Sequence, residues 1–274
     1  MGGARRFLGR AGFVILGMCA LAGCAAPSPG AGGEGTGAEV QRTWERAAVF
    51  IARGREDFIT GRMDEAAVRS ALAGLPPGTR LPAVLFLHGC SGMGAANWAY
   101  MQLLARSGYA VLAPDSFARR DRPSTCDPRR HSGIPGAPFR RVAEMRQEEI
   151  RHAARRLAEL PWVDRENLFL MGHSQGGSAA AAYEGADFKA RVITGSICQL
   201  GLRAPPAAPV ISLYSERDPW LRGRSPRGCE ERARGRGIPI EFHLFPGSDH
   251  NLAHDAEAQR LILDFLARHT KRRP

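Results

Sequence analysis

The stretch Leu168-Phe-Leu-Met-Gly-His-Ser-Gln-Gly-Gly177 joins an apolar run to a Gly-x-Ser-x-Gly pentapeptide and the start of an alanine-rich segment. The apolar run predicts a buried strand, and the small residues 178–182 predict a helix start that packs closely on a sheet. Gly172 and Gly176 leave room for a sharp backbone turn, so the hydroxyl of Ser174 is expected to project above the strand ends. An ordinary glycine-rich connection is the alternative, but the flanking strand and helix favour a turn that presents a nucleophile.

The N-terminus has the layout of an export signal. Three arginines within the first ten residues precede an apolar stretch, 11–21, that is too short to span a bilayer comfortably. The stretch ends in Leu-Ala-Gly-Cys24, which resembles the lipobox of bacterial lipoproteins, so residues 1–23 are expected to be a cleaved signal and Cys24 a lipidated N-terminus. Ordinary secretory cleavage, which would leave Cys24 unmodified, is the alternative. Residues 24–39, rich in Gly, Pro, Ser and Ala, are predicted to be a flexible tether. The protein is therefore expected to be exported and anchored to a bacterial membrane, on the periplasmic side or at the cell surface.

Composition limits the partners of the remaining chain, 40–274, whose length suits one α/β domain with a sizeable core. The full sequence has 38 basic and 27 acidic residues and a formal net charge of +11, and three of its arginines leave with the signal. Nearly all the basic residues are arginine, and they do not form the basic stripe interleaved with aromatic residues that is typical of nucleic-acid-binding modules. Nucleic acid is therefore not expected as a partner.

Short apolar runs alternate with helical segments from residue 83 onward. The predicted strands are 83–87, 109–113, 168–171, 191–197, 210–214 and 240–245. The predicted helices are 95–107, 139–160, 175–184 and 256–269. This alternation predicts a parallel sheet with helices on both faces. Residues 40–75 have apolar residues near helical spacing, which predicts helices divided at Gly54 and Gly61.

A serine is a weak nucleophile unless a base takes its proton and an acid orients that base. Asp218 follows the predicted strand 210–214, and His250 follows the predicted strand 240–245. Both lie just past the carboxyl ends of their strands, the edge at which open α/β sheets bind ligands. We therefore predict that His250 accepts the proton of Ser174 and that Asp218 orients the imidazole.

Three neighbouring residues compete for these roles: Glu216 and Asp249 as the acid, and His254 as the base. Asp218 is favoured over Glu216 because Pro219 marks the turn at the strand end directly after it.

An oxyanion hole requires two N–H donors. One is expected from Gln175, the residue after the nucleophile, and the other from the loop after the first core strand, Leu87-His-Gly-Cys-Ser-Gly92. The N–H of Cys90 is favoured there, with Ser91 second. His88 in this loop is predicted to be a structural hydrogen-bonding residue, and His173 is predicted to be packed and to point away from Ser174.

Four cysteines follow the predicted tether, an even number that permits disulfides in an exported protein. Cys90 and Cys126 follow the first two core strands at the same rim of the sheet, and Cys198 and Cys229 bracket the next strand and loop. The favoured pairs are therefore Cys90 with Cys126 and Cys198 with Cys229, with free buried thiols as the alternative. A long irregular stretch, 115–139, includes Arg119, Arg120, Arg122, Arg129 and Arg130, one of which is suggested to attract anionic esters.

Together these residues resemble an α/β-hydrolase of the dienelactone hydrolase-like group. The motifs that carry the resemblance are Leu87-His-Gly-Cys-Ser-Gly92, Tyr109-Ala-Val-Leu-Ala-Pro-Asp-Ser116, Gly172-His-Ser-Gln-Gly-Gly177, Asp218 and His250. The resemblance covers about residues 80–268 and implies an α/β-hydrolase fold, a mostly parallel sheet with helices on both faces. Dienelactone hydrolase itself has a cysteine nucleophile, whereas Ser174 stands here, so a general serine esterase is expected rather than a lactone-specific enzyme.

The expected activity is therefore hydrolysis of carboxylic esters of small or medium acids through an acyl-enzyme, with no cofactor and no metal. The expected partners are a small ester substrate and, through the lipid on Cys24, a membrane. A peptidase or acyl-peptide hydrolase with the same three residues is one alternative. A non-catalytic lipoprotein on a hydrolase scaffold is another, since a fold alone does not imply function.

Overall fold

The computed structural model of the 274-residue chain describes residues 33–126, 137–221 and 223–271. Cys24, the predicted signal 1–23, Arg129 and Arg130 lie outside the described residues. Within the part of the chain that is described, no helix is long and apolar enough to cross a membrane.

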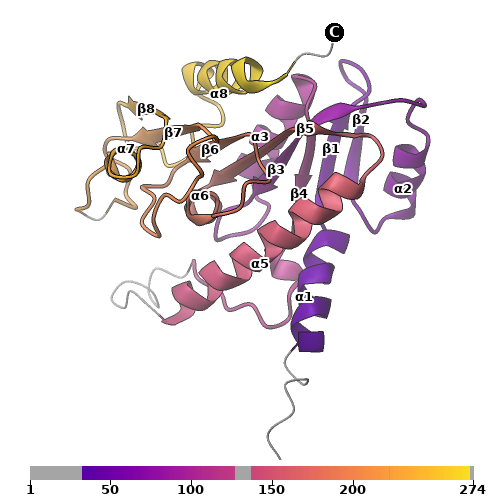
Figure 1. Cartoon of the computed structure of the whole chain (residues 1–274), viewed down its shortest axis with the longest axis horizontal. Helices are drawn as coiled ribbons and strands as arrows, with labels where there is room; N and C mark the ends of the chain where they lie inside the picture. The colour runs from indigo at the N-terminus through magenta and orange to yellow at the C-terminus, as the bar shows by residue number, and fades with distance from the viewer. Residues whose placement is uncertain (1–32, 127–136, 222, 272–274) are drawn as a thin grey trace, which may run out of the picture.

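The described residues form one eight-stranded sheet in the order β2-β1-β4-β3-β5-β6-β7-β8 (Figure 1). The strands are β1 (Ala48–Ala52), β2 (Phe58–Arg62), β3 (Leu81–Leu87), β4 (Ala110–Ala113), β5 (Val163–His173), β6 (Ala190–Thr194), β7 (Val210–Ser215) and β8 (Ile240–Phe245). All pairings from β4 to β8 are parallel, whereas β1 pairs antiparallel with both β2 and β4. The sheet is therefore mostly parallel, as the sequence predicts.

Helices cover both faces of this sheet, which confirms the predicted layering (Figure 1). One face carries α1 (Gly33–Glu45), α2 (Ala66–Ala73), α5 (Ala137–Glu159) and α6 (Gln175–Ala182). The opposite face carries α3 (Ala95–Arg106) and α8 (Ala256–His269). The short α7 (Gly228–Arg234) packs beside β8, and η1 (Ser116–Ala118) is a single 3₁₀ turn after β4.

The core divides along the sheet because side chains of a strand alternate between its faces. In β3, Leu85 and Leu87 pack with α5 and α6, whereas Val84 and Phe86 pack with α3 and α8. All four side chains are fully buried. Burial on both faces explains why these strands are near-continuous apolar runs in the sequence.

The helical prediction for residues 40–75 is wrong over its central part. Helix α1 ends at Glu45, and the chain then forms an antiparallel hairpin of β1 and β2 before α2 begins. The run Ala48-Val-Phe-Ile-Ala52 meets the helical spacing by coincidence, but β-branched and aromatic residues favour a strand. Pairing with β4 buries this run. Gly54 lies in the hairpin connection, and Gly61 adopts φ of +143° within β2.

The predicted tether, 24–39, also differs from the structure at its C-terminal end. Helix α1 begins at Gly33, so residues 33–39 are helical, and α1 packs against α5. Glu39 accepts a hydrogen bond from the backbone N–H of Arg120 and forms an ion pair with Arg42. The part of the tether before Gly33 lies outside the described residues.

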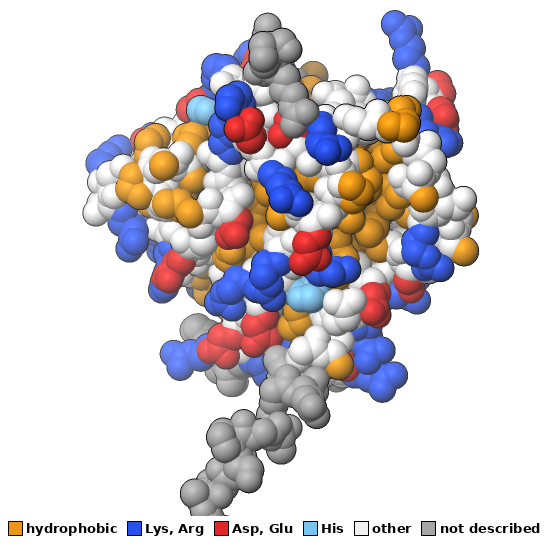
Figure 2. Space-filling model, turned by 45° about the vertical axis from the view of Figure 1, so that its right-hand side comes forward, with side chains coloured by type: hydrophobic (Ala, Val, Ile, Leu, Met, Phe, Trp, Pro, Cys, Tyr) orange, Lys and Arg blue, Asp and Glu red, His pale blue; other side chains and the backbone are white. Residues whose placement is uncertain are grey.

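Charged side chains of both signs are interspersed over the face drawn in Figure 2. Exposed charged side chains also form ion pairs within single helices, such as Arg260 with Glu257 and Asp264 on α8. Pairs of this exposed kind contribute little stability, and their main effect is to mix the signs of surface charge.

Candidate active site

The serine turn joins β5 to α6 with a strained backbone. Ser174 has φ of 57° and ψ of −118°, a conformation that a residue with a side chain rarely adopts. A Cβ atom at Gly172 would overlap the backbone of Gly176, and a Cβ atom at Gly176 would overlap the carbonyl of Leu87. The turn is anchored by the N–H of Ser174, which donates to the carbonyl of Thr194 on β6 at 2.8 Å. Only glycine therefore fits at the two flanking positions.

Ser174, His250 and Asp218 form one continuous chain of hydrogen bonds. His250 Nε2 lies 2.8 Å from Ser174 Oγ, and His250 Nδ1 lies 2.7 Å from Asp218 Oδ2. Because a carboxylate only accepts, Nδ1 carries the imidazole proton and Nε2 is left to accept from the serine hydroxyl. The three residues predicted from chain order are thus brought together by the ends of β5, β7 and β8.

Asp218 is buried, and its remaining oxygen is also satisfied. The backbone N–H of Trp220 donates to Asp218 Oδ1 at 2.8 Å. The hydroxyl of Tyr214 is hydrogen-bonded to the same carboxylate, and burial together with that negative charge raises the pKa of Tyr214. These partners hold the carboxylate in one orientation toward His250.

The competing acids and the competing histidine lie elsewhere. Glu216 forms an exposed ion pair with Arg217. The backbone carbonyl of Asp249 accepts from Ser215 Oγ at 2.6 Å, while the side chains of Asp249 and His254 are exposed. The structure therefore places Asp218, and not Glu216 or Asp249, against His250.

His173 is packed beneath His250, as expected for a buried strand residue. The centroids of the two rings are 5.0 Å apart, and His173 Nδ1 lies 3.2 Å from Thr194 Oγ1. Burial, and secondarily the nearby His250, lower the pKa of His173 to about 3. His173 is therefore neutral near pH 7.

His88 is a buried hydrogen-bonding residue under its loop. Its Nε2 accepts from the N–H of Ser116 at 3.1 Å and from Arg146 Nη1 at 3.3 Å, so its Nδ1 carries the proton that is donated to Gly89 O at 2.7 Å. Burial and the guanidinium of Arg146 lower its pKa well below the usual value. The structural role that the sequence predicts for His88 agrees with these contacts.

The candidate oxyanion donors belong to two segments next to Ser174, the start of α6 and the loop after β3. Gln175 is the first residue of α6, where backbone N–H groups have no acceptor within the helix. The loop with Cys90 is closed by a bridge between Gly89 and Gly92, and a Cβ atom at Gly89 would be 3.5 Å from Ser174 Cβ. Asn97, a residue that sequence reasoning missed, stabilises this loop, because its Nδ2 donates to Gly92 O at 2.9 Å.

Two further buried residues, Arg146 and Glu149, also escaped prediction. They lie three residues apart on α5, and Arg146 donates to His88 O at 2.9 Å while Glu149 accepts from Ser116 Oγ at 2.8 Å. In the sequence their spacing is typical of an exposed ion pair on a helix. Only the packing of α5 against the loops after β3 and β4 makes them internal.

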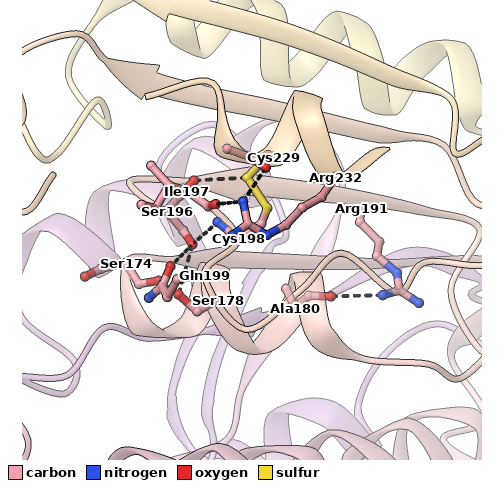
Figure 3. Close-up of a disulfide and its surroundings, with 11 residues drawn as sticks. Ser174, Ser178, Ala180, Arg191, Ser196, Ile197, Cys198, Gln199, Cys229 and Arg232 are labelled. Atoms are coloured by element: carbon pink, nitrogen blue, oxygen red, sulfur yellow. Dashed lines mark hydrogen bonds between the residues drawn. A yellow bond between two sulfur atoms is a disulfide. The ribbon is translucent and has the colours of Figure 1, made fainter. Parts of the chain in front are cut away.

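Both favoured disulfides are present, Cys90–Cys126 and Cys198–Cys229. The second joins the segment after β6 to α7, close to the nucleophile helix (Figure 3). Ser196 Oγ links the two regions, because it bonds to Ser178 Oγ at 2.9 Å and accepts from the N–H of Cys198 at 3.2 Å.

The other end of α6 is capped by a buried arginine from β6. Arg191 donates to the carbonyls of Ala180 at 2.9 Å and Gly185 at 3.0 Å, and also to that of Tyr183 (Figure 3 shows the Ala180 bond). Burial lowers the pKa of Arg191 to about 10, which leaves it charged at neutral pH. The nucleophile helix is therefore fixed at both ends.

No group of three or more His, Cys, Asp or Glu side chains that could hold a metal occurs among the described residues.

Solved structures of related fold were compared with this chain. A provisionally assigned dienelactone hydrolase from Klebsiella pneumoniae is 19% identical with a TM-score of 0.51, over 70% of this chain and 89% of that one. The protein m3DLH is 18% identical with a TM-score of 0.56, over 72% and 90%. An acylaminoacyl peptidase is 18% identical with a TM-score of 0.53, over 73% of this chain but only 39% of the peptidase. No curated protein sequence matches the chain significantly.

The sheet, its helices and these neighbours define an α/β-hydrolase fold. The family model of the dienelactone hydrolase family matches residues 69–267, most of the chain. The chain therefore belongs to the dienelactone hydrolase family. Family and fold together support a hydrolase of the serine-hydrolase type.

Proposed function

We propose that this protein is a serine esterase that cleaves carboxylic esters through an acyl-enzyme on Ser174. The observation that carries the proposal is the pair of hydrogen bonds, 2.8 and 2.7 Å, that joins Ser174 to His250 and His250 to Asp218. Distances of this size allow proton transfer between the serine and the imidazole. The strained turn at Ser174 supports the same role, because such strain is concentrated at functional sites.

In the proposed reaction, Ser174 Oγ attacks the ester carbonyl carbon as its proton passes to His250 Nε2. The tetrahedral intermediate collapses, the C–O bond to the alcohol breaks, and His250 returns the proton to the leaving oxygen. Water then attacks the acyl-enzyme with His250 again as the base, and collapse releases the acid and restores the Ser174 hydroxyl. Asp218 keeps its charge throughout and stabilises the imidazolium. These steps use no cofactor.

The developing oxyanion requires donors on the side of the carbonyl opposite His250. We propose the N–H groups of Gln175, at the start of α6, and of Cys90, in the loop after β3. Two exposed aromatic side chains flank the site. The ring of Trp220 lies 5.8 Å from that of His250, and the ring of Phe117 stacks at 5.7 Å on His88. They offer apolar contacts that suit the acyl or alcohol group of a small or medium ester.

The first test is replacement of the nucleophile. Ser174→Ala should lower ester hydrolysis by several orders of magnitude, because no acyl-enzyme forms without the hydroxyl. A fluorophosphonate probe should label wild type and the control variant Ser107→Ala, an exposed serine at the end of α3, but not Ser174→Ala. Labelling of another serine in the Ser174→Ala protein would contradict the assignment.

Substrate class is tested by assaying wild type on p-nitrophenyl esters of graded acyl length and on peptide amides. Ester hydrolysis with a maximum at short or medium acyl groups is expected. Cleavage of amides in preference to esters would favour the peptidase alternative, and no Ser174-dependent turnover of either class would favour a non-catalytic lipoprotein.

Asp218→Asn should lower kcat by up to about 10⁴-fold, whereas Glu216→Gln should have little effect.

We further propose that Cys24 is the lipidated N-terminus and that it anchors the enzyme to a bacterial membrane. The proposal is supported by the sequence of residues 1–24. Cys24→Ser should move the protein from the membrane fraction to the soluble fraction and stop the incorporation of labelled fatty acid. A Cys24→Ser protein that stays membrane-bound would show that another surface holds it there.

A further inference from the structure

A strap, defined here as residues 116–126, follows β4 and contacts Gln175, the residue after Ser174. It is fixed to the loop after β3 at both ends. At its start the N–H of Ser116 donates to His88 Nε2 at 3.1 Å, and at its end Cys126 is bonded to Cys90. In its middle, Arg119 Nη1 donates a hydrogen bond to Glu148 Oε2 on α5 at 3.2 Å.

Two residues of this strap form hydrogen bonds with the side-chain amide of Gln175, one with its oxygen and one with its nitrogen. Arg122 Nη2 donates to Gln175 Oε1 at 2.8 Å, and Gln175 Nε2 donates to Thr125 Oγ1 at 2.8 Å. Thr125 is buried and Gln175 is partly buried. The residue whose backbone N–H is proposed to bind the oxyanion is therefore fixed through its side chain as well.

Arg122 is itself held in place by neutral groups of the strap. Its Nε donates to Ser116 Oγ at 2.6 Å, and its guanidinium lies 3.9 Å over the ring of Phe117. Among the described residues its Nη1 is buried without a hydrogen-bond partner. Burial, and then repulsion from Arg146, lower the pKa of Arg122 to about 10, so it stays charged at neutral pH. This guanidinium is partly buried, with Glu149 and Asp115 as the nearby opposite charges and one nitrogen unpaired, so its placement contributes little to stability by itself.

We propose that Arg122 is a positioning residue for the proposed hydrolysis, and that it acts through the Gln175 side chain. With both atoms of the amide bound, the first turn of α6 has one position relative to Ser174 and to the Cys90 loop. Without Arg122 the amide is released on one side, and the N–H of Gln175 is no longer aimed at the developing oxyanion. Transition-state stabilisation of this kind depends on donors that are already in place. The inference rests on the proposed function and adds to it the residue, Arg122, that positions one donor of the oxyanion hole.

The test is a double-mutant cycle with Arg122→Met and Gln175→Met, which keep side-chain volume and the backbone N–H. Each single variant should lower kcat about tenfold with little change in KM, less than the 10²–10³-fold cost of removing an oxyanion donor. The double variant should be no slower than the slower single variant, because both remove the same contact. Arg122→Lys should recover part of the lost kcat, since an ammonium can still donate to Gln175 Oε1.

Arg120→Met is the matched control, since Arg120 is an exposed arginine of the same strap, and its kcat on a neutral ester should match wild type. Thr125→Val keeps shape, removes the acceptor for Gln175 Nε2, and provides a second cycle if Arg122→Met folds poorly. Its kcat should also fall, without adding to the effect of Gln175→Met.

Multiplicative losses in kcat in both cycles would overturn the inference, because they would show that the paired residues act independently. A rise in the KM of Arg122→Met with unchanged kcat would also overturn it and would indicate direct substrate contact by Arg122. Absence of Ser174-dependent turnover in wild type would instead overturn the proposed function, and this inference with it. The two failures are therefore distinguishable in one set of assays.

Discussion

At the scale of single residues, the site depends on positions that tolerate no other side chain. Ser174 adopts a backbone conformation that favours glycine, yet it must be a serine to supply the hydroxyl. Gly172 and Gly176 make this conformation feasible because a side chain at either would overlap backbone atoms. Pattern recognition identifies these residues in the sequence because the steric requirement leaves few alternatives.

Gly176→Ala should destabilise the fold by at least about 3 kcal/mol, because the new Cβ overlaps the backbone carbonyl of Leu87, which cannot move without disturbing β3. Gly54→Ala is the control. Its Cβ would meet only Asp57 Cβ, at 3.9 Å, and the change should stay within about 1 kcal/mol. Urea unfolding of both variants measures the difference. Equal stabilities would show that the turn can relax around a methyl group.

At the scale of elements, the βα pattern from β3 to α8, apart from the short α7, could be predicted because burial on both faces makes each strand an apolar run between turn residues. The hairpin of β1 and β2 could not, since the five-residue run 48–52 fits either period and only pairing with β4 decides between them. In the site, Asp218 could be separated from Glu216 by Pro219. The roles of Arg122 and Arg146 depend on which polar residues α5 and the strap bury, and no local spacing encodes that.

The two disulfides enclose similar sequence separations, 36 and 31 residues, but join different elements. Replacing either pair by serines should lower the free energy of unfolding by about 3 to 4 kcal/mol on the chain-entropy estimate. Only loss of Cys90–Cys126 should also lower kcat under folding conditions, because it releases the strap that holds Gln175. Chemical denaturation and kinetics of Cys90→Ser/Cys126→Ser and Cys198→Ser/Cys229→Ser make the comparison. An equal loss of kcat in the two would mean that the effect is general loosening.

At the scale of the whole molecule, stability should depend on pH through histidines buried in the neutral form. The pKa of His173 is about 3 in the folded protein, against about 6.5 in an unfolded chain. Below pH 6.5 the unfolded state therefore binds a proton that the folded state does not, so stability is complete above that pH and falls as pH drops toward 3. His88 acts in the same direction.

Between pH 7.5 and 4.5, His173 alone should cost the fold roughly 2 to 3 kcal/mol. Urea midpoints at the two pH values for wild type and His173→Gln provide the measurement. The variant should lose less stability on acidification, because glutamine takes no proton in either state. The same loss in both proteins would place the acid sensitivity on other groups, such as the carboxylates of the surface ion pairs.

The buried arginine at the end of α6 has a consequence for the opposite end of that helix, about 12 Å away for eight residues. Aligned peptide groups give a helix a positive pole at its first turn and a negative pole at its last, and the two poles partly cancel at a distance. The guanidinium of Arg191 donates to the carbonyls of Ala180 and Tyr183 at this negative pole and neutralises it. What faces Ser174 is then closer to an isolated positive pole than to a dipole, and the potential of such a pole falls off more slowly with distance. Burying a charge on β6 thus makes the field at the nucleophile more favourable to a negative charge on the substrate oxygen.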